Sequence, residues 1–214
     1  MITIKRFVCN MLQENCYVVY DESYEAVIID CGAFYDEERQ AIVNHIDNKH
    51  LRPVRLIATH GHFDHVFGND TIYDHYQLYP EFPADDEWLA TNIPNQYTGM
   101  MGLPYNRPTP PLGKMIHDSD TITFGNHQLK VLSTPGHTPG SVIFYCKEEH
   151  VCFTGDTLFQ GSIGRTDFER GSWEDMQKSL HEIVAKLPTD TRILPGHGPE
   201  TSIEKELAYN PYLR

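Results

Sequence analysis

The sequence predicts an α/β fold in which two mixed β-sheets pack face to face and helices cover both outer surfaces, a four-layer αβ/βα sandwich. The chain divides into two halves, and in each half a run of short apolar strands comes before a helix. Four of the predicted strands end beside a histidine or an aspartate that neighbours glycine. We expect one domain over residues 1–214, with a proline-rich excursion at about 80–113.

Apolar patterning defines the elements of the first half. Runs rich in β-branched residues indicate strands, and the spacing of Ala41, Ile42 and Ile46 indicates a helix. The expected elements are strands over 2–8, 16–20 and 26–29, a helix over 34–49, a strand over 56–59 and a helix over 68–79.

The excursion differs from the rest of the chain because prolines interrupt an apolar segment. Its large apolar side chains are Trp88, Tyr97, Met100, Met101, Leu103 and Tyr105. A linker of this length would be polar, so a lid or a substrate-facing wall is one interpretation. A loop packed against the outside of the core is the other.

The second half begins with a hairpin around Gly125-Asn126. Ser172 has the position of a helix N-cap, with Asp175 three residues later, and Pro188 ends the helix that follows. The expected elements are strands over 121–124, 129–132, 141–146 and 151–154, a helix over 173–187, a strand over 192–194 and a helix over 202–209.

Composition narrows the class of partner. The net charge of −13 disfavours binding to nucleic acid or to an anionic membrane surface. No run of 18 apolar residues is present, and the first residues lack the pattern of a signal peptide. Five cysteines without CxxC spacing suggest reduced core thiols in a cytoplasmic protein. We expect a small-molecule substrate, and the oligomeric state is left open.

The segment Thr59-His60-Gly61-His62-Phe63-Asp64-His65 carries the strongest functional signal. It follows a short apolar strand, and imidazole and carboxylate are ligands of zinc, iron and manganese. His60 and His62 can converge on one metal if the backbone turns, and Gly61 would permit that turn. Asp64 and His65 could face a second metal.

Three later positions repeat this arrangement of an apolar strand, a glycine and a metal-type residue. His137 follows the strand before Pro135-Gly136, Asp156 follows Gly155, and His197 follows Gly196. A lone histidine after a strand is more often structural than a ligand. Four such strand ends in one chain predict a shared metal cleft.

These motifs resemble the metallo-β-lactamase superfamily, and the resemblance covers nearly the whole chain. Within that superfamily the chain is most similar to short-form glyoxalase II, hydroxyacylglutathione hydrolase without its helical C-terminal domain. The segments that carry the resemblance are 134–141 (TPGHTPGS), 153–159 (FTGDTLF), 161–167 (GSIGRTD) and the tail 210–214 (NPYLR).

The resemblance implies two divalent metal ions, with zinc expected and iron or manganese as alternatives. It places His60, His62 and His137 on one metal and Asp64, His65 and His197 on the other, with Asp156 bridging both. Asp64 would also orient the attacking hydroxide, so Asp64 and Asp156 are the expected catalytic residues.

The implied reaction is hydrolysis of a thioester such as S-lactoylglutathione by a metal-bridging hydroxide. A thiolate leaving group, with a pKa of ~8.5, needs little help from a general acid. Arg165 resembles the place where glyoxalase II keeps a glutathione-binding lysine, although an exposed arginine paired with Asp167 is the other interpretation. Tyr105 and Met101 are expected to contact the substrate from the excursion.

Three other functions fit the same residues. A persulfide dioxygenase with one iron shares the ligand motifs and the segment 164–168. A lactone or β-lactam hydrolase has the same ligands. A structural metal scaffold is disfavoured, because structural zinc sites are usually rich in cysteine and closed.

Overall fold

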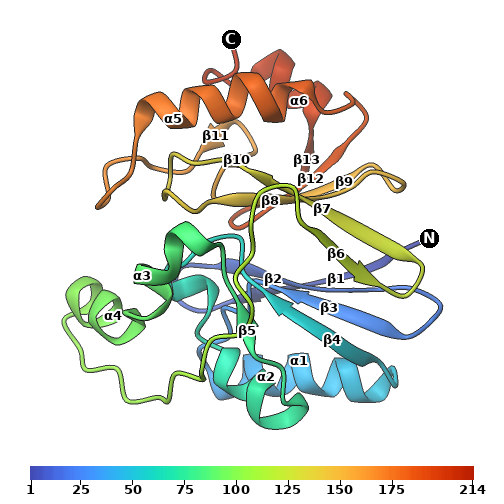
Figure 1. Ribbon diagram of the computed structural model, residues 1–214, viewed down its shortest axis with the longest axis vertical. Helices are drawn as coiled ribbons and strands as arrows, with labels where there is room; N and C mark the ends of the chain where they lie inside the picture. Colours follow the sequence, from blue (N-terminus) through green and yellow to red (C-terminus); the bar gives the residue numbers. More distant parts are fainter.

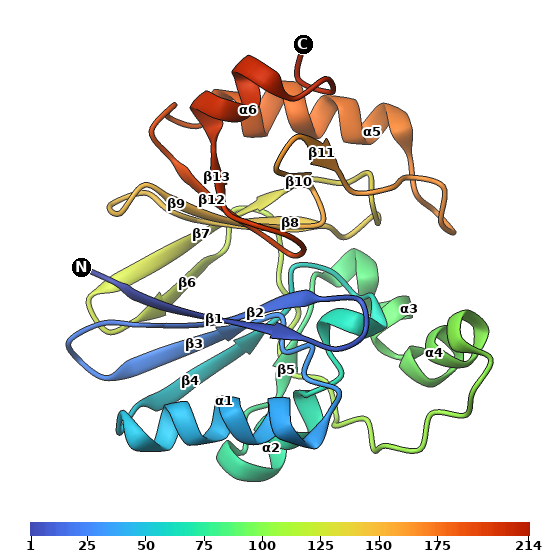
Figure 2. The same cartoon turned by 180° about the vertical axis from the view of Figure 1, so that it is seen from behind.

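Two β-sheets packed face to face form the centre of the structure, a computed structural model that describes residues 1–214. Helices α1 and α2 cover the outer face of one sheet, and α5 and α6 cover the outer face of the other (Figures 1 and 2). The predicted αβ/βα sandwich is therefore confirmed. None of the helices has the length and apolar character that crossing a bilayer requires.

The first sheet combines an antiparallel and a parallel part. Its strands lie in the order β1 (Thr3–Cys9), β2 (Glu14–Tyr20), β3 (Glu25–Ile29), β4 (Arg52–Ile57) and β5 (Pro80–Glu81). Strands β3, β4 and β5 run parallel, which requires one crossover between β3 and β4 and another between β4 and β5. Helices α1 (Asp36–Asn48) and α2 (Asn69–Tyr76) supply these crossovers and bury their apolar faces on the sheet.

The second sheet has six strands and a small two-stranded ribbon beside it. Its order is β13 (Thr201–Ser202), β12 (Arg192–Pro195), β9 (Val151–Gly155), β8 (Val142–Cys146), β7 (His127–Ser133) and β6 (Thr121–Phe124). The ribbon pairs β10 (Leu158–Phe159) with β11 (Ser162–Ile163). The predicted hairpin around Gly125-Asn126 is the turn between β6 and β7.

The helix predicted over 173–187 is not regular throughout. The Ser172 hydroxyl accepts the Asp175 N–H at 3.2 Å, so the expected N-cap is present. The α-helix α5 (Trp173–Lys178) then gives way to a π-helical turn, η3 (Ser179–Ile183), and a 3₁₀ turn, η4 (Val184–Lys186). The Ser179 hydroxyl donates to the Pro135 carbonyl at 2.7 Å, which ties the π-helical turn to the His137 loop. The last helix is α6 (Ile203–Tyr209).

The main core lies between the two sheets. It is built from the inward-facing side chains of both, including Tyr17, Ile29, Phe124, Phe144 and Phe153. Burying one such side chain fully contributes about 1.5–3 kcal/mol. This core fixes the two sheets against each other.

The excursion contains more secondary structure than its prolines suggest. After β5 come a 3₁₀ turn, η2 (Ala84–Asp86), and two short helices, α3 (Glu87–Ala90) and α4 (Ile93–Met101). Pro94 lies in the first turn of α4, where its missing N–H costs nothing, and Gly102 ends the helix in the left-handed region with φ of 67°. The underside of α4 packs on an aromatic cluster that includes Phe63, Phe67 and Tyr97.

The loops that follow β4, β7, β9 and β12 meet at one edge of the sandwich. Two backbone hydrogen bonds join the sheets there. The Val142 N–H donates to Thr59 O at 2.9 Å, and the Asn15 N–H donates to Gly196 O at 2.7 Å. All four predicted ligand loops are thus brought to one place.

Candidate metal centre

Seven side chains of metal-ligand type converge at this edge, and they come from both sheets. The loop after β4 supplies His60, His62, Asp64 and His65. The β7–β8 loop supplies His137, the end of β9 supplies Asp156, and the end of β12 supplies His197. The structure therefore places all seven predicted metal ligands in one site.

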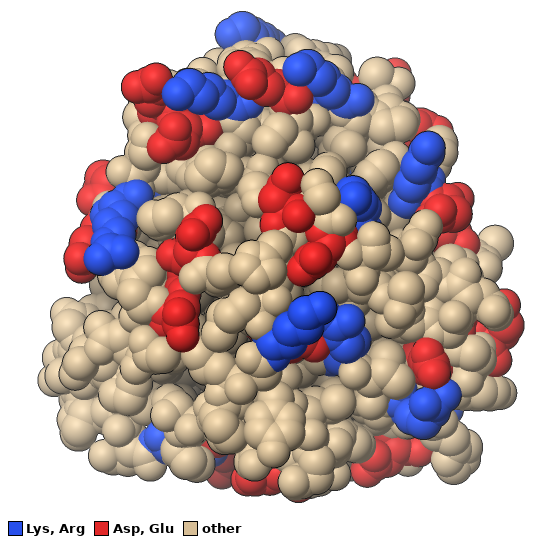
Figure 3. Space-filling view, in the orientation of Figure 1, with Lys and Arg blue, Asp and Glu red and all other residues tan.

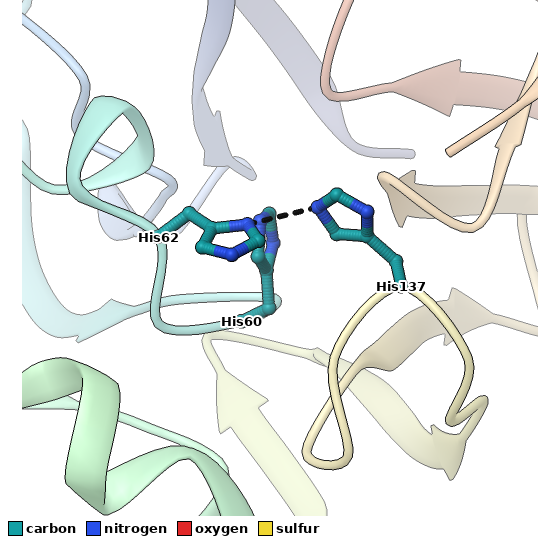
Figure 4. A group of neighbouring side chains, drawn as sticks. All are labelled: His60, His62 and His137. Atoms are coloured by element: carbon teal, nitrogen blue, oxygen red, sulfur yellow. Dashed lines mark hydrogen bonds between the residues drawn. The ribbon is translucent and has the colours of Figure 1, made fainter. Parts of the chain in front are cut away.

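A first group consists of His60, His62 and His137. Their ligand nitrogens lie within 4.8 Å of one another, and His62 Nδ1 is 2.9 Å from His137 Nε2. Figure 4 shows the three rings pointing toward a common point from two different loops. Three imidazoles in this arrangement can bind one metal ion and leave a further position open.

A second group consists of Asp64, His65 and His197, again within 4.8 Å. Asp156 lies between the two groups. Its Oδ1 is 3.3 Å from His65 Nε2, and its Oδ2 is 3.5 Å from His137 Nε2 and 3.7 Å from His197 Nε2. This one carboxylate therefore lies beside imidazoles of both groups, the position that a bridging ligand would occupy.

In four of the five rings, all except that of His62, one nitrogen already contacts an oxygen of the protein. His137 Nδ1 donates to Arg165 O at 2.7 Å, and His197 Nδ1 donates to Leu12 O at 3.1 Å. Such contacts fix the tautomer and turn Nε2 toward the metal position.

Asp30 holds the ring of His65 directly and that of His60 through Thr59, and the sequence analysis did not single it out. Its carboxylate accepts His65 Nδ1–H at 3.1 Å and the Thr59 hydroxyl at 2.7 Å. That hydroxyl lies 3.1 Å from His60 Nδ1 and can accept its hydrogen. Asp30 directly follows β3, so it lies at a strand end like the seven proposed ligands. That position in the sequence could have identified it.

The electrostatics of the site also suit metal binding. Burial, followed by the neighbouring His65 and His62, holds the pKa of His60 well below its usual value. Burial and the adjacent His137 lower the pKa of His62 to about 3. Both rings are therefore neutral near pH 7, which is the form that binds a metal.

For Asp156 and His65, neighbouring charges outweigh the effect of burial on the pKa. Burial alone would raise the pKa of Asp156, but the nearby imidazoles of His65, His197 and His137 lower it well below its usual value. Burial would lower the pKa of His65, but the carboxylates of Asp156, Asp64 and Asp30 raise it well above 6.5. Buried carboxylates this close together require positive charge among them.

The donor set fits two divalent metal ions. The buried atoms His60 Nε2, His65 Nε2 and Asp156 Oδ1 have no hydrogen-bond partner within the protein. Such groups are costly to bury unless something binds them. Nitrogen and oxygen donors without thiolate suit zinc, iron or manganese.

Five of the seven residues form the floor of a cavity of about 630 Å³: His62, Asp64, His137, Asp156 and His197. One wall is the 159–169 segment, with Phe159, Ile163, Arg165 and Phe168. The other is the α3–α4 segment, with Trp88, Leu89, Asn92, Gln96 and Met100. The polar side chains of α4 that line this wall had no signal in the sequence, because asparagine and glutamine are common on any helix surface.

The expected substrate contacts are placed differently from one another. Arg165 lines the cavity, forms two hydrogen bonds to Asp167 at 2.6 and 2.7 Å, and stacks on Phe168. Arg165 is therefore both an exposed arginine paired with Asp167 and a side chain that a substrate in the cavity could reach. Tyr105 and Met101 do not line the cavity; they pack against the aromatic cluster under α4. The neighbouring Met100 faces the cavity in place of Met101, because one residue along a helix turns the side chain by about 100°.

Gly61 also differs from the expectation. Its φ is not positive, so it does not make a turn reserved for glycine. A Cβ at this position would lie 2.6 Å from Leu89 Cβ and 3.2 Å from Asp86 Cβ. Gly61 is thus required by the close approach of the excursion.

Comparison with known proteins agrees with this site. The model of the metallo-beta-lactamase superfamily matches residues 9–197. A probable metallo-hydrolase of Bacillus subtilis, YqgX, is 34% identical over 98% of this chain and 96% of its own. The hydroxyacylglutathione hydrolase GloC of Haemophilus influenzae is 34% identical over 94% of this chain and 93% of its own. The crystal structure of BLEG-1, a B3 metallo-beta-lactamase, superposes with a TM-score of 0.89 at 34% identity and covers 99% of both chains.

The fold and the convergent ligands define a metal-dependent hydrolase. The chain belongs to the metallo-beta-lactamase superfamily. The resemblance noted in the sequence is thereby confirmed at the level of the family, and one of its relatives is a hydroxyacylglutathione hydrolase.

Proposed function

We propose that this protein is a thioester hydrolase with two metal ions, and that S-lactoylglutathione or a related thioester is its substrate. The observation that carries the proposal is the convergence of all seven predicted ligands, five of which line a cavity, with Asp156 between the two groups. Zinc is the metal we expect. The GloC relative supports the thioester class.

Two bound metals would supply Lewis acidity and bring the pKa of a shared water from 15.7 toward ~7. The chain's own residues then have defined roles. Asp64 Oδ2 lies 3.3 Å from His197 Nε2 and borders the cavity, where it can orient the attacking water and receive its proton. Asp156 keeps the two groups of ligands at a fixed separation.

The cavity walls favour a substrate with an apolar part near the reacting carbon. Phe168 packs edge-on against His62, with ring centroids 5.4 Å apart, and so covers the first group of ligands. No serine or cysteine lines the cavity, so the protein offers no hydroxyl or thiol of these residues as the nucleophile. A thioester suits this site because its thiolate, of pKa ~8.5, leaves without a proton donor.

Arg165 is the one lysine or arginine that lines the cavity, and we propose that it binds a carboxylate of the substrate. Its pairing with Asp167 reduces its net charge but leaves it at the cavity wall. Lysine and arginine alternate with acidic side chains over the face in Figure 3, without one basic patch. Because Arg165 is the one lysine or arginine of the cavity lining, recognition of an anionic thiol carrier would depend on this residue and the metals.

β-Lactam hydrolysis is the second candidate, because BLEG-1 is described as a B3 metallo-beta-lactamase and is 34% identical. The test compares the purified, metal-loaded protein on S-lactoylglutathione and on a cephalosporin, alongside elemental analysis. We expect close to two metals per chain and a kcat/KM at least ~100-fold higher on the thioester, since an amide nitrogen needs protonation to leave. Equal turnover of the cephalosporin would reject the thioester proposal.

Oxygen uptake separates the dioxygenase alternative. A single tightly held iron, with consumption of O₂ and no hydrolysis, would replace the hydrolase by that function. All five cysteines are unpaired and buried, which supports a reducing compartment, and we place the protein in the cytoplasm.

A further inference from the structure

A buried carboxylate of the excursion binds two of the ligand loops at once. Asp86, the last residue of η2, has no exposed surface. Its Oδ2 accepts the Gly61 N–H at 2.9 Å and the Thr138 hydroxyl at 2.6 Å, and its Oδ1 accepts the Gly140 N–H at 2.8 Å. Gly61 separates His60 from His62, and Thr138 follows His137 directly.

Both loops are shaped around this side chain. A Cβ on Gly140 would lie 2.6 Å from Asp86 Cγ, and one on Gly61 would lie 3.2 Å from Asp86 Cβ. The side of Gly61 away from Asp86 is also held, since Gln96 Nε2 donates to Gly61 O at 3.0 Å. The N–H and the carbonyl of Gly61, the residue between two predicted ligands, are thus both bound by side chains of the excursion.

The chemistry of the contact requires a carboxylate. All three partners donate, and none carries a charge, so the side chain must accept at both oxygens. An asparagine would turn an N–H₂ donor toward one of these donors. Hydrogen bonds to a charged acceptor are about twice as strong as neutral ones, and more so where water is excluded.

We propose that Asp86 is the positioning residue of the first metal group, setting the separation between the His60–His62 turn and the His137 loop. This proposal rests on the metal centre proposed above. It gives the excursion a role beyond walling the cavity, because its first turn is the template on which three histidines are assembled. The second group contains no residue next to Gly61, Thr138 or Gly140, so we expect the loss of Asp86 to leave that group unaffected.

The test measures zinc affinity for each site by competition with a chromophoric chelator. Asp86→Asn is compared with Asp85→Asn, an exposed neighbour in the same turn. We expect Asp86→Asn to weaken the first zinc by about 10–100-fold, the range seen when a residue behind a metal ligand is removed. The second zinc and the Asp85→Asn protein should match wild type.

A double-mutant cycle locates the effect. His62→Ala removes a ligand of the first group, so adding Asp86→Asn to it should leave the affinity of the remaining zinc unchanged. A purely structural carboxylate would instead weaken both sites, or neither, and either result would overturn the proposal. Loss of the remaining zinc in the double variant would do the same.

Thr138→Val covers the case in which Asp86→Asn does not fold. It removes one of the three hydrogen bonds and keeps the shape of the side chain, and a smaller loss of the first zinc in the same direction is expected. Unchanged zinc affinity in Thr138→Val would count against the positioning role. A wild-type chain that binds no metal would defeat the proposed function itself, which distinguishes the two failures.

Discussion

Single nitrogen and oxygen atoms decide what this site can hold. In four of the five histidines a protein oxygen takes one ring nitrogen, so the other is directed into the site. His62 is the exception, since its Nδ1 itself faces His137. This ring is therefore the ligand least supported by the protein and the most informative one to remove.

Replacing His62 with alanine should lower the metal content from about two ions per chain to about one and abolish hydrolysis. The two histidines left in the first group cannot hold an ion tightly by themselves. Elemental analysis after gel filtration is the measurement, and His75→Ala, an exposed histidine of α2, is the matched control. Two ions retained in the His62 variant would show that this ring is no ligand.

Arg165 and Asp167 make a second pair of predictions at the residue scale. Arg165→Ala should raise KM for an anionic glutathione thioester only severalfold, because water and the paired Asp167 screen this exposed guanidinium. Asp167→Asn should lower that KM, because it frees the guanidinium that now binds Asp167. A neutral thioester is the control substrate, and both variants should hydrolyse it like wild type. Identical KM values for the anionic substrate would assign Arg165 to the surface.

Among the elements, the excursion divides into a face that meets the cavity and a face that meets the core. Met100 and Trp88 lie on the first face, and Tyr97 and Tyr105 on the second. Its helices are two short segments, and apolar periodicity cannot show over so few residues. The sequence therefore predicted the excursion but not which of its side chains turn inward.

Alanine substitutions of Tyr105 and Met100 should accordingly have different effects, the first on stability and the second on KM. Tyr105 stacks on Phe67 and packs at a tilt against Tyr97, with ring centroids 6.1 and 5.5 Å away, so Tyr105→Ala should cost about 2 kcal/mol of unfolding free energy. Its KM should stay unchanged. Met100→Ala should raise KM and leave the free energy of unfolding near that of wild type. Urea denaturation and steady-state kinetics on both variants are the measurements, and a reversed pattern would mean that the cavity is bounded differently in solution.

The convergence of the seven proposed ligands was predictable from the sequence, and the residues that hold them were predictable only in part. Each of the seven follows an apolar strand, so local sequence and the topology of the sheets bring them together. Asp30 shares that position and could have been found in the same way. Asp86 could not, because its three partners are 25 to 54 residues away in the chain, and only the folded structure brings them together.

For the whole molecule, the two sheets are joined at opposite ends by different means. At the end away from the site, the Asn126 N–H donates to Asp21 Oδ2 at 2.7 Å and the Gly125 N–H donates to Glu25 Oε2 at 2.6 Å. These bonds link the β6–β7 turn to the turn between β2 and β3. At the site, four proposed ligands come from the first sheet and three from the second, so bound metals would join the sheets there.

Removing the metals should therefore loosen one end of the sandwich and leave the other unchanged. A chelator should lower the unfolding midpoint, because free metal at 1,000 times its Kd contributes about 4 kcal/mol per site to the folded state. Hydrogen exchange should quicken at the Val142 amide, which bonds across the sheets to Thr59 O beside the ligands. The Asn126 amide, at the far end, should exchange at its original rate, and chelator already saturated with zinc should change neither. Equal acceleration at both amides would mean that the metals stabilise the fold globally and do not act as a local cross-link between the two sheets.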